Sequence, residues 1–206
     1  MSAKTDFLRT IAAEAQRSKA GAAKASDDGM RDFASCPQAG SVVKDFEPPA
    51  PDAPSPIPHL QPFADMDYWA LVTPLRWASE LTLPPEVIVP RGFVTDFATI
   101  PSIFWSWMPR TGRYGLPAVI HDWLYWEQTV TRIEADDLFD AALGVLEVPI
   151  WQRFAIYRSV RWFGGRYWDG NTAEKEQGLK RVIVRFPDDP RISWAEWRAL
   201  PDVFTA

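Results

Sequence analysis

Four residues in the second half of the chain have the types and spacing that hydrolytic chemistry uses. His121 and Asp122 are adjacent, Tyr125 follows the histidine by four positions, and Asp136 lies within a second, acidic segment. An imidazole oriented by a carboxylate can act as a general base near neutral pH. The same residue types also form hydrogen-bonded clusters that only join two helices. The four residues therefore fit either a catalytic site or a cluster that only joins two helices.

A helical hairpin over residues 118–143 would position these side chains. Pro117 fits the first turn of one helix, and Thr131 with Glu134 forms the capping-box pattern that starts the next. His121 and Tyr125 share a helical face because they are four residues apart. A short connection makes the two helices antiparallel neighbours, so we expect Asp136 to lie near His121. Asp136 could also pair with Arg132, four residues before it.

The remaining patterns predict an α+β fold. Segments 68–73, 75–83 and 87–94 are predicted strands of a small antiparallel sheet that precedes the hairpin. A short helix is expected over 101–108, and a third long helix over 149–163, ended by Gly164 and Gly165. The tail holds a predicted strand over 181–186 and a short helix over 193–200, capped by Ser193 with Glu196.

The chain divides by composition into four parts. Residues 1–47 are predicted to be an extended arm, partly helical or disordered, and residues 48–66 a proline-rich linker that includes His59. Seven of the fifteen residues over 48–62 are proline, which favours extended backbone over helix or central strand. Residues 67–170 are the predicted folded domain, and residues 171–206 a C-terminal extension.

Composition excludes several classes of function. The net charge is -5 and no dense basic run is present, which argues against nucleic-acid binding. Cys36 is the single cysteine, so neither an intrachain disulfide nor a cysteine-rich zinc site can form. The apolar runs are too short for a transmembrane segment. The chain is expected in the cytoplasm of a bacterial host during its synthesis, or in a particle assembled there.

Three blocks of sequence together resemble a known family. They are Gly92-Phe-x-Thr-Asp96-x-Ala-Thr-Ile-Pro101, then His121-Asp122-x-Leu-Tyr125, then Arg132-x-x-Ala-Asp136-x-x-Phe139, followed by a Trp- and Arg-rich segment ending in Gly-Gly. This order resembles the DUF1353 family over roughly residues 68–168. The family occurs in bacteria, prophages and tailed phages, and its biochemical function is unassigned.

The His-Asp segment is also similar to the helix pair of secreted phospholipase A2. This likeness implies that His121 is the general base, Asp136 orients its imidazole, and Tyr125 supports the pair. It also implies Ca²⁺ or another divalent metal at Asp122. Separately, Asp96 is either a third carboxylate that enters the site from its loop as a candidate metal ligand, or a residue that only shapes the turn. The disulfides and the glycine-rich calcium loop of that family have no counterpart here. Arg110 and Arg113 are candidates for binding an anionic head group of a substrate, or for pairing with the acidic helix.

Two functions follow as alternatives. In the first, the chain is a phage or prophage hydrolase that uses His121, Asp136 and Tyr125 to cleave an ester in a lipid or in the cell envelope. In the second, it is a non-enzymatic virion or tail-assembly protein. Its residues 1–60 would then bind neighbouring particle proteins, and the histidine cluster would only stabilise the fold.

Overall fold

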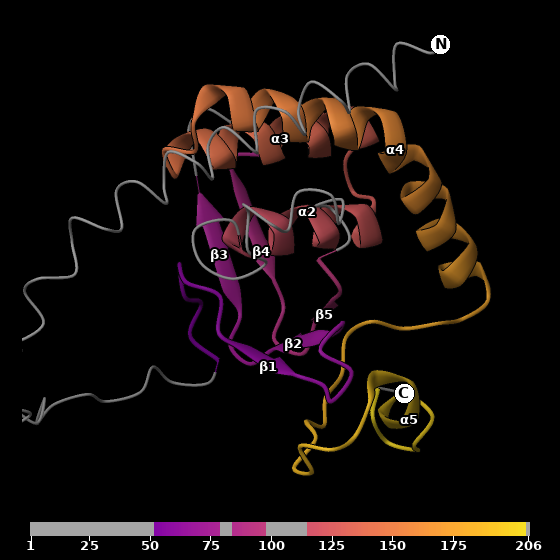
Figure 1. The fold of residues 1–206 in the computed structure, drawn as a ribbon. Coiled ribbons are helices and arrows are strands. Elements are labelled where there is room, and N and C mark those ends of the chain that lie inside the picture. Colours follow the sequence, from indigo (N-terminus) through magenta and orange to yellow (C-terminus); the bar gives the residue numbers. More distant parts are fainter. Residues whose placement is uncertain (1–51, 79–83, 98–114, 205–206) are drawn as a thin grey trace, which may run out of the picture. The chain divides into compact units, whose positions relative to one another are not determined.

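The computed structural model describes residues 52–78, 84–97 and 115–204, which all belong to one compact unit, Pro49–Ala206. The predicted arm over residues 1–47 and the predicted helix over 101–108 lie outside these ranges. The strands are β1 (Leu60–Pro62), β2 (Trp69–Leu71), β3 (Leu75–Ala78), β4 (Glu86–Val89) and β5 (Val94–Thr95) (Figure 1). The helices are α2 (Gly115–Glu127), α3 (Arg132–Val145), α4 (Ile150–Glu176) and α5 (Trp194–Trp197). The α+β class is confirmed.

Two small antiparallel sheets form the β part. One has the order β1-β2-β5, and the other pairs β3 with β4. In the second sheet, Leu75 opposes Val89 and Trp77 opposes Val87, and these four side chains are buried while their neighbours in each strand are exposed. This alternation follows from the two-residue period of a strand with one buried face. The predicted strand over 87–94 is divided, because Pro90 lacks the N–H needed to continue the ladder.

The folded part begins earlier than the sequence predicted. Residues 60–62, within the predicted linker, form β1 and pair with Trp69–Leu71 of β2. Phe63 is only 2 % exposed and belongs to the core. Pro62 is tolerated because β1 lies at the edge of its sheet, where a missing N–H leaves no inner strand unpaired. Proline content therefore indicated the extended backbone correctly, but not its incorporation into a sheet.

The predicted helical hairpin is confirmed. Thr131 caps α3, and Thr131 with Glu134 forms both hydrogen bonds of the capping box. Helix α2 is buried over most of its length because it packs against α3, α4, β4 and β5. Figure 1 shows α2 between the strands and the layer that contains α3 and α4. The side chains of α2 are therefore held on several sides.

Helix α4 continues through Gly164 and Gly165 as far as Glu176, so the predicted stop at this glycine pair is wrong. Each glycine costs about 1 kcal/mol in a helix interior relative to alanine, a cost that tertiary contacts can outweigh. Beyond the pair, Asn171 donates to the Tyr125 carbonyl (3.1 Å) and Lys175 to the Glu127 carbonyl (3.2 Å). These bonds satisfy carbonyl groups that the end of α2 would otherwise leave without a helical partner.

The C-terminal segment is part of the fold and not a separate extension. The predicted strand over 181–186 forms only isolated bridges, Phe93 to Val182 and Ile183 to Phe204. Helix α5 is capped by Ser193 and Glu196 as predicted. One buried cluster joins this segment to the first sheet, and it comprises Phe63, Ala70, Val94, Ile183, Trp194, Trp197 and Val203.

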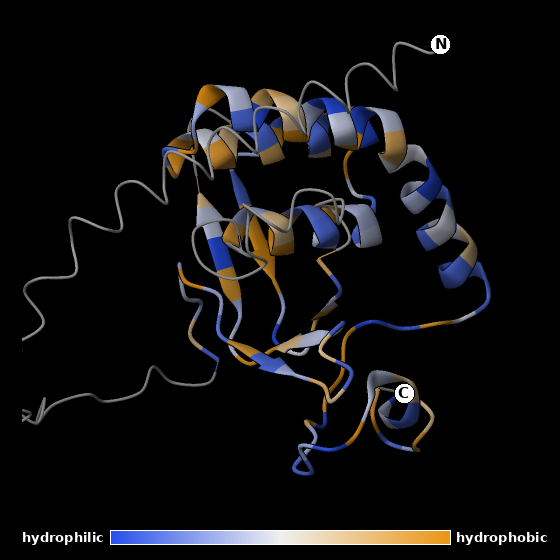
Figure 2. Ribbon diagram, in the orientation of Figure 1, coloured by the Kyte–Doolittle hydropathy of each residue, from blue (hydrophilic) through white to orange (hydrophobic). Residues whose placement is uncertain are grey.

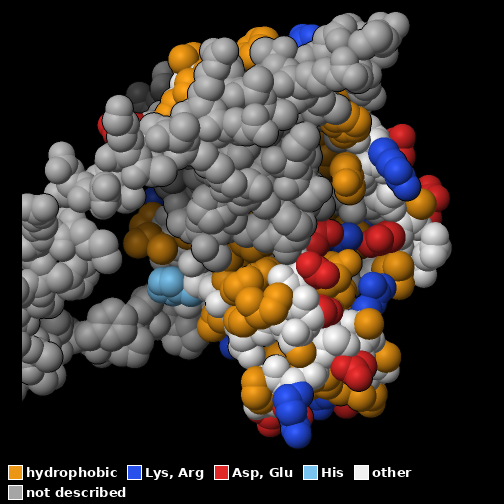
Figure 3. All heavy atoms as spheres, in the orientation of Figure 1, with side chains coloured by type: hydrophobic (Ala, Val, Ile, Leu, Met, Phe, Trp, Pro, Cys, Tyr) orange, Lys and Arg blue, Asp and Glu red, His pale blue; other side chains and the backbone are white. Residues whose placement is uncertain are grey.

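Helix α3 is amphipathic, because its buried residues recur at helical spacing on one side. Figure 2 shows hydrophobic and hydrophilic residues interspersed along α3 and α4. Acidic and basic side chains are interspersed on the visible part of the described surface (Figure 3). Among the described helices, even the 27-residue α4 lacks an apolar stretch that could cross a membrane.

Candidate functional site

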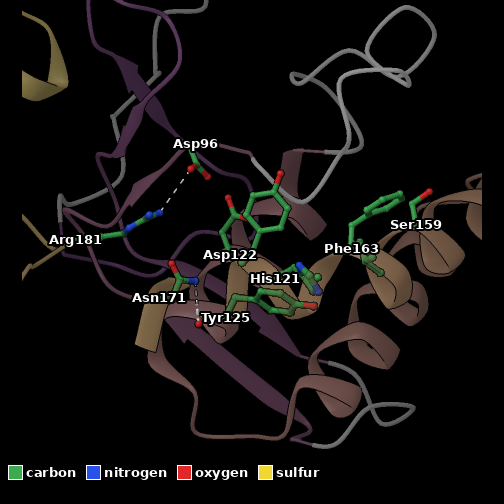
Figure 4. A pocket seen from close by; sticks show the side chains of 11 residues that line it. Asp96, His121, Asp122, Tyr125, Ser159, Phe163, Asn171 and Arg181 are labelled. Carbon is green, nitrogen blue, oxygen red and sulfur yellow. Dashed lines mark hydrogen bonds and ion pairs between the residues drawn. The ribbon is translucent and has the colours of Figure 1, made fainter. Parts of the chain in front are cut away.

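A pocket with a volume of about 50 Å³ lies where α2, α4, the end of β5 and the segment after α4 meet. Figure 4 shows His121, Asp122 and Tyr125 in its middle, with Asp96 and Arg181 toward one side and Ser159 and Phe163 toward the other. Among the described residues, its lining comprises Asp96, His121, Asp122, Tyr125, Ser159, Val160, Phe163, Gly164, Tyr167, Asn171 and Arg181. Three residues of the predicted His-Asp-x-x-Tyr segment therefore face one cavity.

His121 is paired with Asp136, as predicted. The His121 Nε2 lies 3.0 Å from Asp136 Oδ1, and the two side chains are 1 % and 0 % exposed. An ionised carboxylate only accepts hydrogen bonds, so Nε2 carries the proton that it donates. Burial lowers the pKa of His121 from its ordinary value, and the hydrogen bond and charge of Asp136 only partly oppose this effect. The imidazole is therefore neutral near pH 7, with Nδ1 as its proton-accepting atom.

Besides His121, three side chains on α2, α3 and α4 donate hydrogen bonds to the Asp136 carboxylate. Tyr125 Oη donates to Oδ1 (2.6 Å), while Arg132 and Arg161 each donate to Oδ2 (3.3 Å). Burial alone would raise the pKa of this carboxyl group. The hydrogen bonds from His121 and Tyr125 and the charge of Arg132 nevertheless keep its pKa below the usual value. Asp136 is therefore a fixed anion behind the pocket wall, and the predicted pairing with Arg132 is also present.

Tyr125 connects the pocket to this anion. Its ring lies 4.1 Å from the His121 ring and 5.2 Å from the Trp168 ring, measured between centroids. Burial raises the pKa of the Tyr125 hydroxyl, and the hydrogen bond to Asp136 raises it further. The hydroxyl thus stays protonated and remains a donor to Asp136 throughout the neutral range.

The two predicted metal ligands line the same pocket but have different partners. Asp122 accepts a hydrogen bond from Thr95 at the end of β5. Asp96 lies 3.8 Å from Arg181, which also pairs with Glu174 at 3.3 Å. Over the described ranges, no group of three or more His, Cys, Asp or Glu residues is arranged as a metal site. Metal binding by Asp122 and Asp96 stays a prediction.

Phe97 directly follows Asp96 and has an unusual backbone conformation. Its φ is 52°, in the left-handed region that a bulky residue rarely adopts. Its side chain is fully buried and its amide donates to Thr95 Oγ1 (3.2 Å). These contacts hold the conformation next to Asp96, which lines the pocket.

The sequence blocks that carry His121 and Asp136 coincide with a known family. The model of DUF1353, described as a protein of unknown function, matches residues 69–160. Residues 69–160 are a DUF1353 domain. No curated protein and no solved structure gave a significant match. The similarity to phospholipase A2 therefore remains an inference from the residues alone.

The DUF1353 match contains His121, Asp122, Tyr125 and Asp136 but not the whole pocket. The lining residues Phe163, Gly164, Tyr167, Asn171 and Arg181 follow it in the sequence. The sequence did not predict Tyr167 and Asn171 in the site because the predicted helix ended at Gly164, and Arg181 follows α4 in a segment with no helical spacing to place it. Once the helix is continued, Val160, Phe163, Gly164, Tyr167 and Asn171 recur at the three- and four-residue spacing of one helical face. Arg110 and Arg113 lie outside the described residues.

Proposed function

We propose that the DUF1353 domain with its flanking segments is a hydrolase in which His121 activates water. The observation that carries the proposal is the Asp136 carboxylate, which receives the Nε2–H of a buried histidine that lines a pocket. This arrangement directs Nδ1 to act as the base, and a fixed carboxylate stabilises the imidazolium ion that forms.

The proposed reaction is ester hydrolysis. His121 Nδ1 takes a proton from water while the water oxygen attacks the ester carbonyl carbon. The tetrahedral intermediate then collapses, and the proton held by His121 passes to the departing alkoxide. The products are an acid and an alcohol, and the imidazole returns to its neutral form. Asp136 stays ionised throughout, because its low pKa keeps the proton on the imidazole.

The pocket wall supports an apolar ester as substrate. Val160, Phe163 and Tyr167 come from one face of α4 and line the pocket beside His121 and Tyr125. Such a surface suits the first carbons of the acyl group of a lipid or cell-envelope ester, because burial of each CH₂ group contributes about 0.8 kcal/mol, and a pocket of about 50 Å³ holds only this end of the chain. Asp96 and Asp122 supply carboxylate oxygens, the ligand type that calcium prefers. Calcium needs six or more such oxygens, so metal dependence is a separate question for the assay.

The test is hydrolysis of nitrophenyl esters of increasing chain length, and of phosphatidylglycerol vesicles, by the full chain. His121→Asn should lower kcat by about 10²–10⁴-fold. His59→Asn, at the other histidine, should leave kcat unchanged and is the matched control. Circular dichroism verifies folding, and Tyr125→Phe provides a second variant with a smaller structural change. Assays with added Ca²⁺ and with EDTA decide metal dependence. Activity that survives in His121→Asn would overturn the proposal.

A second function, particle assembly, is favoured by a different surface. Ile150 and Phe154 lie one turn apart near the start of α4, with 76 % and 59 % of their surfaces exposed. Exposed apolar side chains of this size suit contact with a protein partner. In this function Asp136 and its donors only join α2, α3 and α4. Residues 1–60, predicted to bind neighbouring subunits, would contribute the remaining contacts.

The test of assembly uses truncation where the compact unit begins. Deletion of residues 1–48 spares Ser55, which pairs with Leu75, and β1. Particles should lose the truncated protein if the arm binds neighbouring subunits, whereas the folded unit should retain its melting temperature. Ile150→Asp with Phe154→Asp should weaken incorporation independently. Normal incorporation of both proteins would exclude this function.

A further inference from the structure

Gly164 lies directly against the hydroxyl group of Tyr125. A Cβ atom built at this glycine would be 2.3 Å from Tyr125 Oη, 3.3 Å from Cζ and 3.4 Å from Cε1. The first distance is far below a van der Waals contact, so a side chain of any size here requires Tyr125 to move. Glycine is therefore the residue that fits at position 164, because the Tyr125 hydroxyl occupies the space that a side chain would fill.

Gly165, the next residue, provides a contrast within the same helix. Apart from its chain neighbours and the nearby helix backbone, a Cβ atom built there meets no atom of the described residues within 4 Å. Both glycines lie in the interior of α4, where glycine is unfavourable relative to alanine. Only at Gly164 does the surrounding structure give a reason to retain it.

Tyr125 cannot easily yield to a new side chain. The residue is 5 % exposed, and its ring contacts the rings of His121 and Trp168. Its hydroxyl donates to Asp136 Oδ1, the same oxygen atom that receives the Nε2–H of His121. Displacement of the hydroxyl would thus remove one of the two donors that hold this oxygen in place.

We propose that Gly164 is a positioning residue of the site: its missing side chain leaves room for the Tyr125 hydroxyl to reach Asp136, and so fixes the carboxylate that orients His121. The structural part stands on the contacts of Gly164, Tyr125 and Asp136 alone. The catalytic part rests on the proposed hydrolase function.

The structural part is tested by a double-mutant cycle on thermal unfolding. Gly164→Ala should lower the melting temperature by about 5 °C or more, whereas Gly165→Ala should raise it slightly. Tyr125→Phe removes the oxygen that the new methyl group would strike. In that background Gly164→Ala should cost clearly less, by at least half of its effect in the unmodified chain. Equal effects of the two glycine substitutions, or the same loss in both backgrounds, would overturn the proposal.

NMR of tyrosine labelled with ¹³C at Cζ supplies a readout that a general loss of packing does not mimic. The Tyr125 signal is assigned by its absence in Tyr125→Phe. It should shift in Gly164→Ala as the hydroxyl leaves the carboxylate. Gly165→Ala should leave the signal unchanged. An unmoved Tyr125 signal in folded Gly164→Ala contradicts the proposal.

Kinetics then separate this inference from the proposed function. With an active ester, Gly164→Ala should reduce kcat about tenfold because the base loses its orientation, and it should change KM less because Val160 and Phe163 still line the pocket. Gly165→Ala should keep both constants. If the unmodified chain hydrolyses no ester, the hydrolase fails, while the double-mutant cycle and the Tyr125 NMR shift still decide whether Gly164 positions Tyr125. If hydrolysis is present and Gly164→Ala keeps full kcat, the catalytic part of the inference is wrong.

Discussion

Asp136 and Asp96 belong to the two sides of one site and are held in different ways. Asp136 is fully buried behind His121 and Tyr125 and receives four hydrogen bonds from donors on α2, α3 and α4. Asp96 lines the pocket, has a quarter of its side chain exposed, and pairs with Arg181 at 3.8 Å. The buried carboxylate is fixed by the packing of three helices, whereas the partly exposed one pairs with Arg181 in the pocket wall.

This difference implies different consequences of substitution. When a buried charge is removed, the groups that paired with it stay buried without an opposite charge, which lowers the stability of the fold. An ion pair near the surface is screened by water and contributes little to stability. Substitutions at Asp136 should therefore be expressed mainly as loss of stability, and substitutions at Asp96 mainly as altered binding.

The largest expected effect is that of Asp136→Asn. The amide has no charge to balance Arg132 and Arg161 and presents an NH₂ group to donors, so the free energy of unfolding should fall by about 3–5 kcal/mol. Asp137→Asn is the matched control, because this neighbouring carboxylate accepts a bond from Tyr157 at the exposed surface. Its effect should stay within about 1 kcal/mol. Urea unfolding measures the stability of both variants. Equal losses would show that the buried Asp136 contributes no more to stability than the exposed Asp137.

Acid should destabilise the protein in two stages. Folding lowers the pKa of both His121 and Asp136, so each binds a proton more readily in the unfolded chain. Stability is complete above about pH 6.5, falls as the pH drops toward the lowered pKa of His121, and falls again below about pH 3.8 through Asp136. One proton contributes a slope of at most about 1.4 kcal/mol per pH unit.

Urea unfolding between pH 7 and pH 5 isolates the histidine contribution. His121→Gln should flatten the slope in this range, whereas His59→Gln retains His121 and should retain its acid-dependent loss. A slope that survives in His121→Gln would assign the effect to other groups.

A smaller effect is expected for Tyr125→Phe. It removes a 2.6 Å hydrogen bond to a buried carboxylate, worth about 1.5–3 kcal/mol when one partner is charged. Tyr157→Phe removes a 2.7 Å bond to Asp137 at the exposed surface and should cost less than about 0.5 kcal/mol. The two pairs have the same chemistry and nearly the same length, so calorimetry of both variants measures the contribution of burial. Similar losses would contradict the contrast between the two environments.

The smallest stability change is expected for Asp96→Asn, below about 1 kcal/mol, because the ion pair with Arg181 is long and partly exposed. Its effect should be on KM for an active ester, since Asp96 lines the pocket. Glu174→Gln is the control, because Glu174 pairs with the same arginine without lining the pocket. A KM that changes equally in both variants would assign the effect to Arg181 and not to Asp96.

The sequence predicted the hairpin correctly because its signals are local. The Thr131–Glu134 capping box, Pro117 and the four-residue spacing of His121 and Tyr125 each depend on neighbouring residues only. The pairing of His121 with Asp136 followed from the hairpin. The second half of the pocket could not follow, because Gly164 and Gly165 are helix stops by local propensity, and contacts with α2 decide otherwise.

By itself, the sequence determined the α+β class, the capped helices and the pairing of Asp136 with His121 and Arg132. These depend on periodicity and on short-range hydrogen bonding, which a chain carries whatever its surroundings. The tertiary structure alone decided that β1 joins the sheet, that α4 runs to Glu176, and that Arg181 reaches the pocket beside Asp96. These outcomes depend on packing between segments far apart in the chain, where burial and hydrogen bonding outweigh the local preferences of proline and glycine.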